Sequence, residues 1–159
     1  MSSFTRIDHV GIACRDLQAS VAFYTETYGF TLEHEEVNEE QGVREAMLRV
    51  SGTDDGGASY IQLLEPIRDD SPVARFLDRN GEGVHHVAFG TGDVAAASAR
   101  AAERGVRVLD PEPRAGSMGS RIAFLHPKDC GGVLTELVEA AGGHGGSAEG
   151  GSTGSGTRP

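Results

Sequence analysis

Hydrophobic and polar positions follow the same pattern at two places in the chain, and each place predicts the same succession of elements. The segments "IDHVGIA" (7–13) and "VHHVAFG" (84–90) read as short buried strands that carry a histidine. Segments with helical character follow at 17–28 and 94–104, each starting after an aspartate and ending at a glycine. Aspartate is a favoured N-cap and glycine a favoured C-cap, so both segments are predicted to be helices.

The match extends when His9 is aligned with His86. An aspartate lies seven residues after each histidine, and a strand is expected after each helix, at 30–37 and at 106–110. A self-similarity of this kind indicates an internal repeat.

The ends of the two units also correspond. Gln62 in "YIQLLEP" lies 53 residues after His9, and Glu136 in "LTELVEA" lies 50 residues after His86. Each places a polar side chain inside an otherwise apolar strand. Each unit therefore reads as a strand, a helix and three further strands.

This organisation predicts an α+β fold made of two βαβββ modules. The first module spans 5–65 and the second 82–140, and the connecting segment 66–81 contains a short helix near 73–77. The Gly/Ser-rich tail, 142–159, is predicted to be disordered because it cannot bury enough apolar surface to offset chain entropy.

Four candidate metal ligands lie at equivalent places in the two modules: His9, Gln62, His86 and Glu136. A single histidine in a strand is more often a hydrogen-bonded core residue, but its recurrence together with a polar partner strand favours a shared site. Two imidazoles, an amide oxygen and a carboxylate suit a borderline or hard divalent cation. An octahedral ion would keep two positions for a substrate with neighbouring oxygens.

Strand alternation predicts where these histidines point. His9 shares a face with Gly11, and His86 shares a face with Ala88, so a small neighbour is expected to leave room for a ligand. His85 falls on the opposite face and is expected to be structural or to support the site. The remaining histidines have no repeat equivalent and receive no role: His34, His126 and His144.

Glu45 is a further candidate, in "EQGVREAMLRV". If Ala46, Leu48 and Val50 pack under the helix, Glu45 and Met47 face the cavity. A carboxylate in a largely apolar cavity is a candidate base with a tuned pKa. The pattern leaves solvent exposure of Glu45 equally open.

Composition excludes several classes of function. The formal net charge of -10 argues against binding to nucleic acid, which requires clustered Lys and Arg. No apolar run reaches membrane-spanning length, and "MSSFTRID" lacks the core of a signal peptide. Cys14 and Cys130 are too few for a disulfide framework. We therefore expect a cytoplasmic protein with reduced thiols and no membrane partner.

In these motifs the sequence resembles the methylmalonyl-CoA epimerase family of the vicinal oxygen chelate superfamily (the glyoxalase fold). The likeness lies in "IDHVGIA", "EQGVRE", "IQLLEP", "HHVAF", "RIAFLHPK" and "GVLTELVE", over nearly all of 5–140. It implies that the βαβββ repeats form a curved mixed sheet around a metal-binding cleft, and that the chain forms a homodimer. It places the metal ligands on His9, Gln62, His86 and Glu136.

The resemblance also implies the reaction. The enzyme would interconvert (2R)- and (2S)-methylmalonyl-CoA by removing the α-proton, through an enolate stabilised by a divalent cation. Co²⁺ is the first expectation, with Mn²⁺, Ni²⁺ or Zn²⁺ as alternatives. The family's catalytic glutamate falls on Glu45, and inversion needs a second acid/base group, for which Glu136 is the candidate.

The loop "RAGSMGSRIAF" is the candidate contact for the substrate's carboxylate or thioester arm. Ser117, Gly119 and Arg121 would supply polar groups and backbone amides there. An ordinary hairpin loop is the alternative interpretation.

Three other functions fit the same fold. A lactoylglutathione lyase-type glyoxalase runs a similar proton transfer on a glutathione hemithioacetal. A 2-His-1-carboxylate dioxygenase fits less well, because Gln62 adds a fourth ligand. A metal-free ligand-sequestering protein would have no use for the four candidate ligands.

Overall fold

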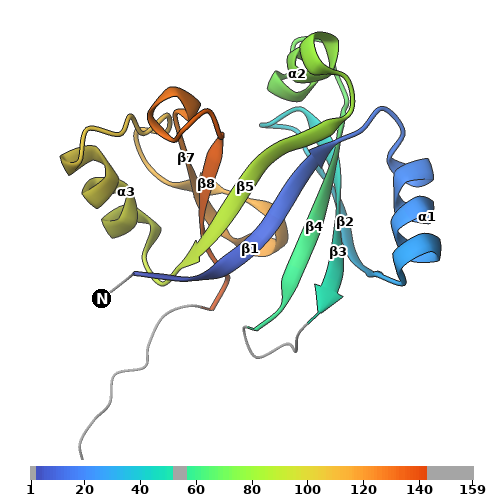
Figure 1. Ribbon diagram of the computed structural model, residues 1–159, viewed down its shortest axis with the longest axis horizontal. Helices are drawn as coiled ribbons and strands as arrows, with labels where there is room; N and C mark the ends of the chain where they lie inside the picture. Colours follow the sequence, from blue (N-terminus) through green and yellow to red (C-terminus); the bar gives the residue numbers. More distant parts are fainter. Residues whose placement is uncertain (1–2, 52–56, 143–159) are drawn as a thin grey trace, which may run out of the picture.

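Eight strands form one mixed sheet in this computed structural model, which describes residues 3–51 and 57–142 (Figure 1). The strands are β1 (Phe4–Ala13), β2 (Thr31–Asn38), β3 (Val43–Ser51), β4 (Ser59–Pro66), β5 (Gly83–Thr91), β6 (Arg114–Ala115), β7 (Arg121–Leu125) and β8 (Thr135–Glu139). Their order in the sheet is β2-β3-β4-β1-β5-β8-β7-β6. The two central strands, β1 and β5, are antiparallel, whereas β1 pairs with β4 and β5 pairs with β8 in parallel.

Helices lie beside both halves of the sheet. They are α1 (Leu17–Tyr28), α2 (Pro72–Asn80) and α3 (Val94–Glu103), with single 3-10 turns at η1 (Ser117–Gly119) and η2 (Pro127–Asp129). Helix α1 lies beside β2–β4, and α3 lies beside β7 and β8 at the other end of the sheet (Figure 1). The predicted α+β fold, with two βαβββ repeats in a curved mixed sheet, is confirmed.

The tail predicted to be disordered, 142–159, lies outside the described part of the chain except for residue 142. Within that part, no helix combines the length and the apolar character needed to cross a membrane.

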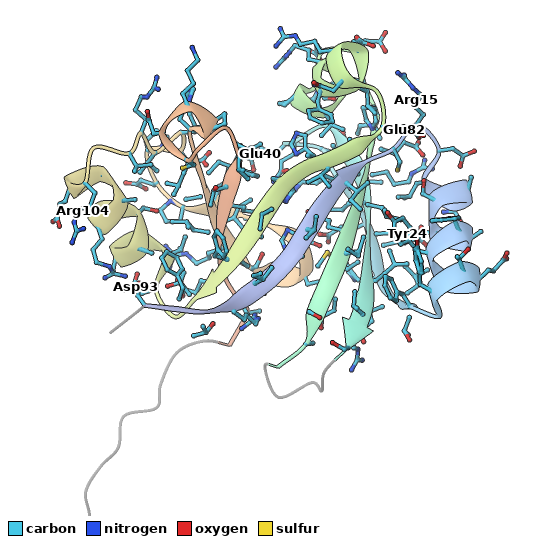
Figure 2. The ribbon with its side chains drawn as sticks, in the orientation of Figure 1. Arg15, Tyr24, Glu40, Glu82, Asp93 and Arg104 are labelled. Carbon is cyan, nitrogen blue, oxygen red and sulfur yellow. The ribbon has the colours of Figure 1, made fainter. Side chains whose placement is uncertain are left out.

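Both long helices begin in the same way. The carboxylates of Asp16 and Asp93 accept the amide of the third helical residue at 3.0 and 2.9 Å, as predicted for N-caps (Asp93 is labelled in Figure 2). A second carboxylate, from the end of the parallel strand, accepts the first helical amide: Glu65 for α1 at 2.5 Å and Glu139 for α3 at 3.0 Å. Two otherwise unpaired amides of each helix start are therefore satisfied, and the bond to the glutamate ties the helix to the sheet.

The face of the sheet under α1 is apolar. Leu17 and Val21 of the helix pack against Ala46, Leu48 and Leu63, and burying each leucine contributes roughly 1.5–3 kcal/mol. Because neighbouring strand residues point to opposite faces, the alternate positions of β3 and β4 project away from the helix. Those positions carry the candidate site, on the inner face of the curled sheet.

The second half repeats this arrangement under α3. Val94 and Ala97 of α3 pack on Ala123, Leu125 and Leu137 of β7 and β8. Glu136, the candidate ligand next to Leu137 in β8, occupies an alternate position and therefore projects from the inner face.

The prediction of a strand at 106–110 is wrong. At 106–110 the chain makes a single bridge, Val108 with Leu125, and the paired strand β6 comes later. Pro111 and Pro113 have no amide hydrogen and cannot extend a ladder there. The Asp110 carboxylate accepts the amide of Phe124 at 2.7 Å, in place of a strand carbonyl.

We predict that Asp93→Ala lowers the free energy of unfolding by about 1 kcal/mol, because the third amide of α3 loses its acceptor. Urea unfolding followed by circular dichroism measures this loss. Asp93→Asn keeps a capping oxygen and should retain most of the stability; equal stability of all three proteins would contradict the capping argument.

Candidate metal and catalytic site

Two rows of residues across the central strands build the candidate site. In one row, His9 of β1 and Glu136 of β8 both pair with Ala88, which lies between them on β5. In the other row, Gln62 of β4 and His86 of β5 both pair with the residue between them on β1, Gly11. Side chains paired across neighbouring strands share a face, so the four candidate ligands project from the inner face.

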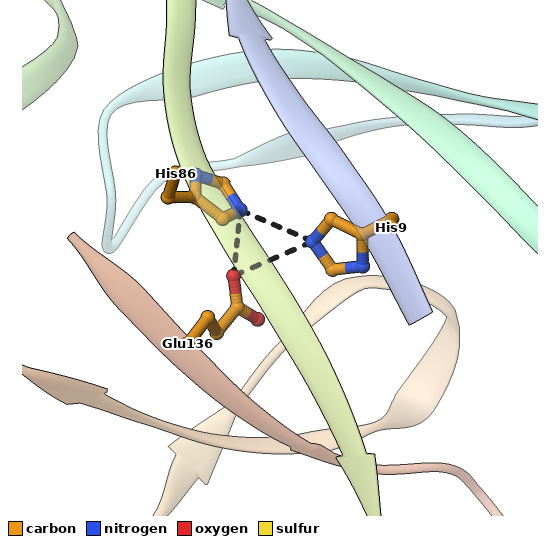
Figure 3. A group of neighbouring side chains, drawn as sticks. All are labelled: His9, His86 and Glu136. Atoms are coloured by element: carbon orange, nitrogen blue, oxygen red, sulfur yellow. Dashed lines mark hydrogen bonds and ion pairs between the residues drawn. The ribbon is translucent and has the colours of Figure 1, made fainter. Parts of the chain in front are cut away.

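Three of these side chains meet directly (Figure 3). The Nε2 atoms of His9 and His86 lie 3.1 Å apart. Oε2 of Glu136 lies 2.8 Å from Nε2 of His86 and 3.4 Å from Nε2 of His9. All three residues are buried, and one ligand atom from each lies within 4.8 Å of the others, a spacing that a metal ion could bridge.

Gln62 extends this group. Its Nε2 donates a hydrogen bond to Oε2 of Glu45 at 2.8 Å, which directs the amide hydrogens toward that carboxylate. Its Oε1 is buried and has no hydrogen-bond partner among the described residues. A buried acceptor without a partner costs roughly 1–3 kcal/mol, so the donor set fits a cation that would use this oxygen.

Interactions within the cluster favour an ionised Glu136 and a positively charged His9. Burial opposes ionisation of Glu136, but the imidazoles of His86 and His9 outweigh it and hold the pKa of this carboxyl well below its usual range. Burial likewise favours a neutral His9, but Glu136 and Asp8 outweigh it and raise the pKa of His9 to about 9. The site is therefore built to hold positive charge beside a carboxylate.

Gly11, in the row of Gln62 and His86, has a different role from the one predicted. A Cβ added at Gly11 would lie 2.1 Å from Cε1 of His86, closer than any real contact. The interpretation that this small residue leaves room for a ligand is corrected: the imidazole of the neighbouring strand fills the space.

Glu45 lies on the inner face, as one of its two interpretations required. It is 1% exposed, and Met47 beside it is also buried, so the solvent-exposed alternative is wrong. Burial and the nearby carboxylate of Glu36 raise the pKa of Glu45 to about 8. A carboxyl with such a pKa can accept and return a proton near neutral pH.

A pocket of about 210 Å³ opens next to the cluster and reaches His9 and Glu136. Its wall includes Arg6, Met47, Tyr60, Ser117 and Met118. Of the three residues expected to contact substrate, Ser117 lies on this wall. Gly119 and Arg121 are not part of it.

Arg121 shares the helix-covered face of β7. It lines a second pocket next to α3, and its guanidinium lies 3.6 Å from the carboxylate of Glu139. The alternation in "RIAFL" carries this signal, because Ala123 and Leu125 pack under α3 and Arg121 belongs to the same set of positions.

Sequence reasoning missed two partners of the site and assigned a third only loosely. Asp8 is buried, its carboxylate lies 2.8 Å from Nδ1 of His9, and Arg6 forms an ion pair with it. Nδ1 of His85 lies 3.0 Å from Nδ1 of His86. Burial, with the neighbouring His86, lowers the pKa of His85 to about 4. The available signal was adjacency in sequence to a candidate ligand.

Comparison with known proteins gives the family. The model of the Glyoxalase/Bleomycin resistance protein/Dioxygenase superfamily matches residues 8–124. A Streptomyces coelicolor methylmalonyl-CoA epimerase variant, solved with 2-nitronate-propionyl-CoA, is 68% identical, with a TM-score of 0.85 over 87% of this chain and 99% of that one. The chain belongs to the methylmalonyl-CoA epimerase family. The resemblance read from the motifs is thereby confirmed.

Two further members of the epimerase family support the assignment. A methylmalonyl-CoA epimerase solved with methylmalonyl-CoA and NH4+ is also 68% identical, with a TM-score of 0.85 over 88% of this chain and 97% of that one. The ethylmalonyl-CoA/methylmalonyl-CoA epimerase of Cereibacter sphaeroides is 38% identical over 84% of this chain and 97% of its own length.

We predict that Gly11→Ala displaces the imidazole of His86 and weakens binding of divalent cations, with a loss of roughly 1–3 kcal/mol in stability from overpacking. Calorimetric titration with Co²⁺ and thermal unfolding measure the two effects. Gly83→Ala is the matched control, because a Cβ at this position in β5 meets nothing within 4 Å. Unchanged Co²⁺ affinity in Gly11→Ala would show that the ring does not need this space.

Proposed function

We propose that this chain interconverts (2R)- and (2S)-methylmalonyl-CoA by removing and returning the α-proton. One observation carries the proposal: a buried glutamate, Glu45, is hydrogen-bonded to Gln62 on the same inner face as the cluster of His9, His86 and Glu136. The two solved relatives, in complex with 2-nitronate-propionyl-CoA and with methylmalonyl-CoA, support this choice of substrate.

His9, Gln62, His86 and Glu136 are proposed to hold a divalent cation, Co²⁺ first and Mn²⁺, Ni²⁺ or Zn²⁺ as alternatives. The donor set and the unpartnered Oε1 of Gln62 support this assignment. When bound, such a cation supplies Lewis-acid stabilisation of the negative charge that develops on the substrate oxygens.

Glu45 is proposed to act as the base on one face of the α-carbon. Its raised pKa lets the carboxylate take the proton and then hold it as a neutral acid, ready to return it. The hydrogen bond from Gln62 orients this carboxyl, and burial excludes the bulk water that would compete for the proton.

The opposite face needs a second acid/base group, because inversion requires that the proton returns from the other side. We assign this role to Glu136, which lies on the wall of the pocket and belongs to the proposed ligand set. Its two oxygens would divide the work, one toward the cation and one toward the proton.

The pocket is proposed to receive the acyl end of the substrate, with Ser117 as a contact. Gly119 and Arg121 stay predictions for the outer part of the thioester arm. A homodimer is expected from the family, and a cytoplasmic setting agrees with Cys14 and Cys130, which are both free thiols.

We predict that the protein, incubated in heavy water with one stereoisomer of methylmalonyl-CoA, incorporates deuterium at the α-carbon and produces the other isomer. Treatment with EDTA should abolish both, and Co²⁺ should restore them; chiral chromatography and mass spectrometry follow the products. Turnover of the glutathione hemithioacetal alone would favour a glyoxalase, and the absence of any bound or required cation would favour a metal-free binder.

We predict that Glu45→Gln lowers kcat by roughly 10²- to 10⁴-fold while Co²⁺ still binds, because the amide cannot take a proton. Steady-state epimerisation and α-proton exchange measure the loss. Glu26→Gln, an exposed position on α1, is the matched control. Exchange at the unmodified rate in Glu45→Gln would remove this residue from its assigned role.

A further inference from the structure

The ladder between β1 and β5 contains an extra residue on β1 at Asp8. Ile7 pairs with Phe89, and the next pair is His9 with Ala88, so two steps on β1 match one step on β5. In a regular strand, neighbouring side chains point to opposite faces and cannot meet. A β-bulge increases the local twist and redirects the extra side chain, here beside the ring of the histidine that follows.

The same ladder contains a second extra residue, this time on β5. Gly11 pairs with His86, and the next pair is Ile12 with Val84, which leaves His85 without a partner on β1. A further register shift lies between Phe4 and Arg6, at the start of β1. The bulges at Asp8 and His85 stand at the two ends of one short regular ladder, and each lies directly before a histidine of the candidate site.

Each bulge residue contacts Nδ1 of its neighbouring histidine. Oδ1 of Asp8 lies 2.8 Å from Nδ1 of His9, and the other oxygen of this carboxylate is held by Arg6 at 2.5 Å. Nδ1 of His85 lies 3.0 Å from Nδ1 of His86. The Phe76 ring of α2, with its centroid 5.1 Å from that of His85, packs edge-on and fixes the His85 ring.

The contact with Asp8 determines where the proton of His9 lies, and the contact with His85 is compatible with the same arrangement in His86. An ionised carboxylate can only accept, so Nδ1 of His9 donates to Asp8. In a neutral imidazole one nitrogen carries the hydrogen and the other offers a lone pair. A histidine that binds a metal ion is neutral, so with Nδ1 protonated it offers the lone pair of Nε2. Nε2 is the atom that faces Glu136 in both histidines.

We propose that Asp8 and His85 are positioning residues, which keep the proton of His9 and His86 on Nδ1 so that both Nε2 lone pairs face one divalent cation. The inference rests on the proposed function, in which these histidines are ligands. It assigns a role to two residues outside the proposed ligand set, one of which, Asp8, also lines the pocket proposed for the substrate. His85 accepts through Nδ1 and carries its own proton on Nε2.

The two positioning contacts, Asp8 with His9 and His85 with His86, are not equally strong. Asp8 makes a charge-assisted hydrogen bond, which is roughly twice as strong as a neutral one. His85 offers a neutral acceptor. Loss of Asp8 should therefore weaken cation binding more than loss of His85 does.

The test measures Co²⁺ binding to the full chain by competition with a chromophoric chelator, together with the visible spectrum of the bound Co²⁺. Asp8→Ala and His85→Phe each remove the acceptor, and the phenyl ring keeps the packing on Phe76. Asp8→Asn and His85→Gln retain an acceptor oxygen. Asp93→Ala, which removes an aspartate hydrogen bond far from the site, is the matched control.

We expect a loss of Co²⁺ affinity of roughly 10- to 100-fold and an altered Co²⁺ spectrum in Asp8→Ala, and smaller changes of both kinds in His85→Phe. Asp8→Asn and His85→Gln should recover part of both. Asp93→Ala should lower the unfolding temperature and leave affinity and spectrum unchanged. A purely structural role would change unfolding temperature alone.

The outcomes separate this inference from the proposed function. Affinities and spectra equal to those of the unmodified protein in all four variants would overturn the positioning role and leave the proposed metal site intact. Failure of the unmodified protein to bind Co²⁺, Mn²⁺, Ni²⁺ or Zn²⁺ would overturn both. Long-range ¹H–¹⁵N spectra of the Zn²⁺-loaded protein give the tautomers directly; a proton on Nδ1 of both rings supports the assignment, and its absence refutes it.

Discussion

The antiparallel pairing of β1 with β5 is the constraint on which the rest of the structure depends. It joins the two halves of the chain and brings two histidines, 77 positions apart, to within 3.1 Å through their ring nitrogens. The parallel partners β4 and β8 then bring Gln62 and Glu136 into the same two rows. Neither half carries enough donors for a site by itself, so the sheet must form as a whole before the inner face acquires its chemistry.

Burial gives these polar side chains their properties. Glu45, His9 and Glu136 are all removed from water, and each responds differently because its neighbours differ. Glu136 lies beside imidazoles and stays ionised, whereas Glu45 lies near another carboxylate and favours its neutral form. Two glutamates on one inner face thus have opposite protonation preferences, which is the arrangement that acid–base chemistry on two faces of a carbon requires.

The repeat made much of this predictable from sequence. Helices 17–28 and 94–104 were located by their aspartate and glycine caps, and α1 and α3 match them closely. His9 and His86 could be paired because strands and helices recur in the same order. Glu45 was left between two interpretations, because alternation alone does not say which face of a strand is covered.

Other features depend on strand register, which the order of apolar and polar positions does not record. A bulge adds one residue and hardly changes the order of apolar and polar positions, so the contacts of Asp8 and His85 could not be read from "IDHV" or "VHHV". The close approach of His86 to Gly11 depends on three-dimensional register. The strand expected at 106–110 failed because the prolines after it outweigh the β-branched residues within it.

The donors of the candidate site are divided across the seam between two halves that twist relative to each other. Neighbouring strands rotate by roughly 20–25°, so the distance from one half's donors to the other's varies with the coiling of the sheet at this seam. Residues on the outer surface of β1 and β5 thereby influence the spacing of donor atoms that they never touch. For the proposed cation, the fit of ions of different radius would depend on sheet curvature as well as on donor chemistry.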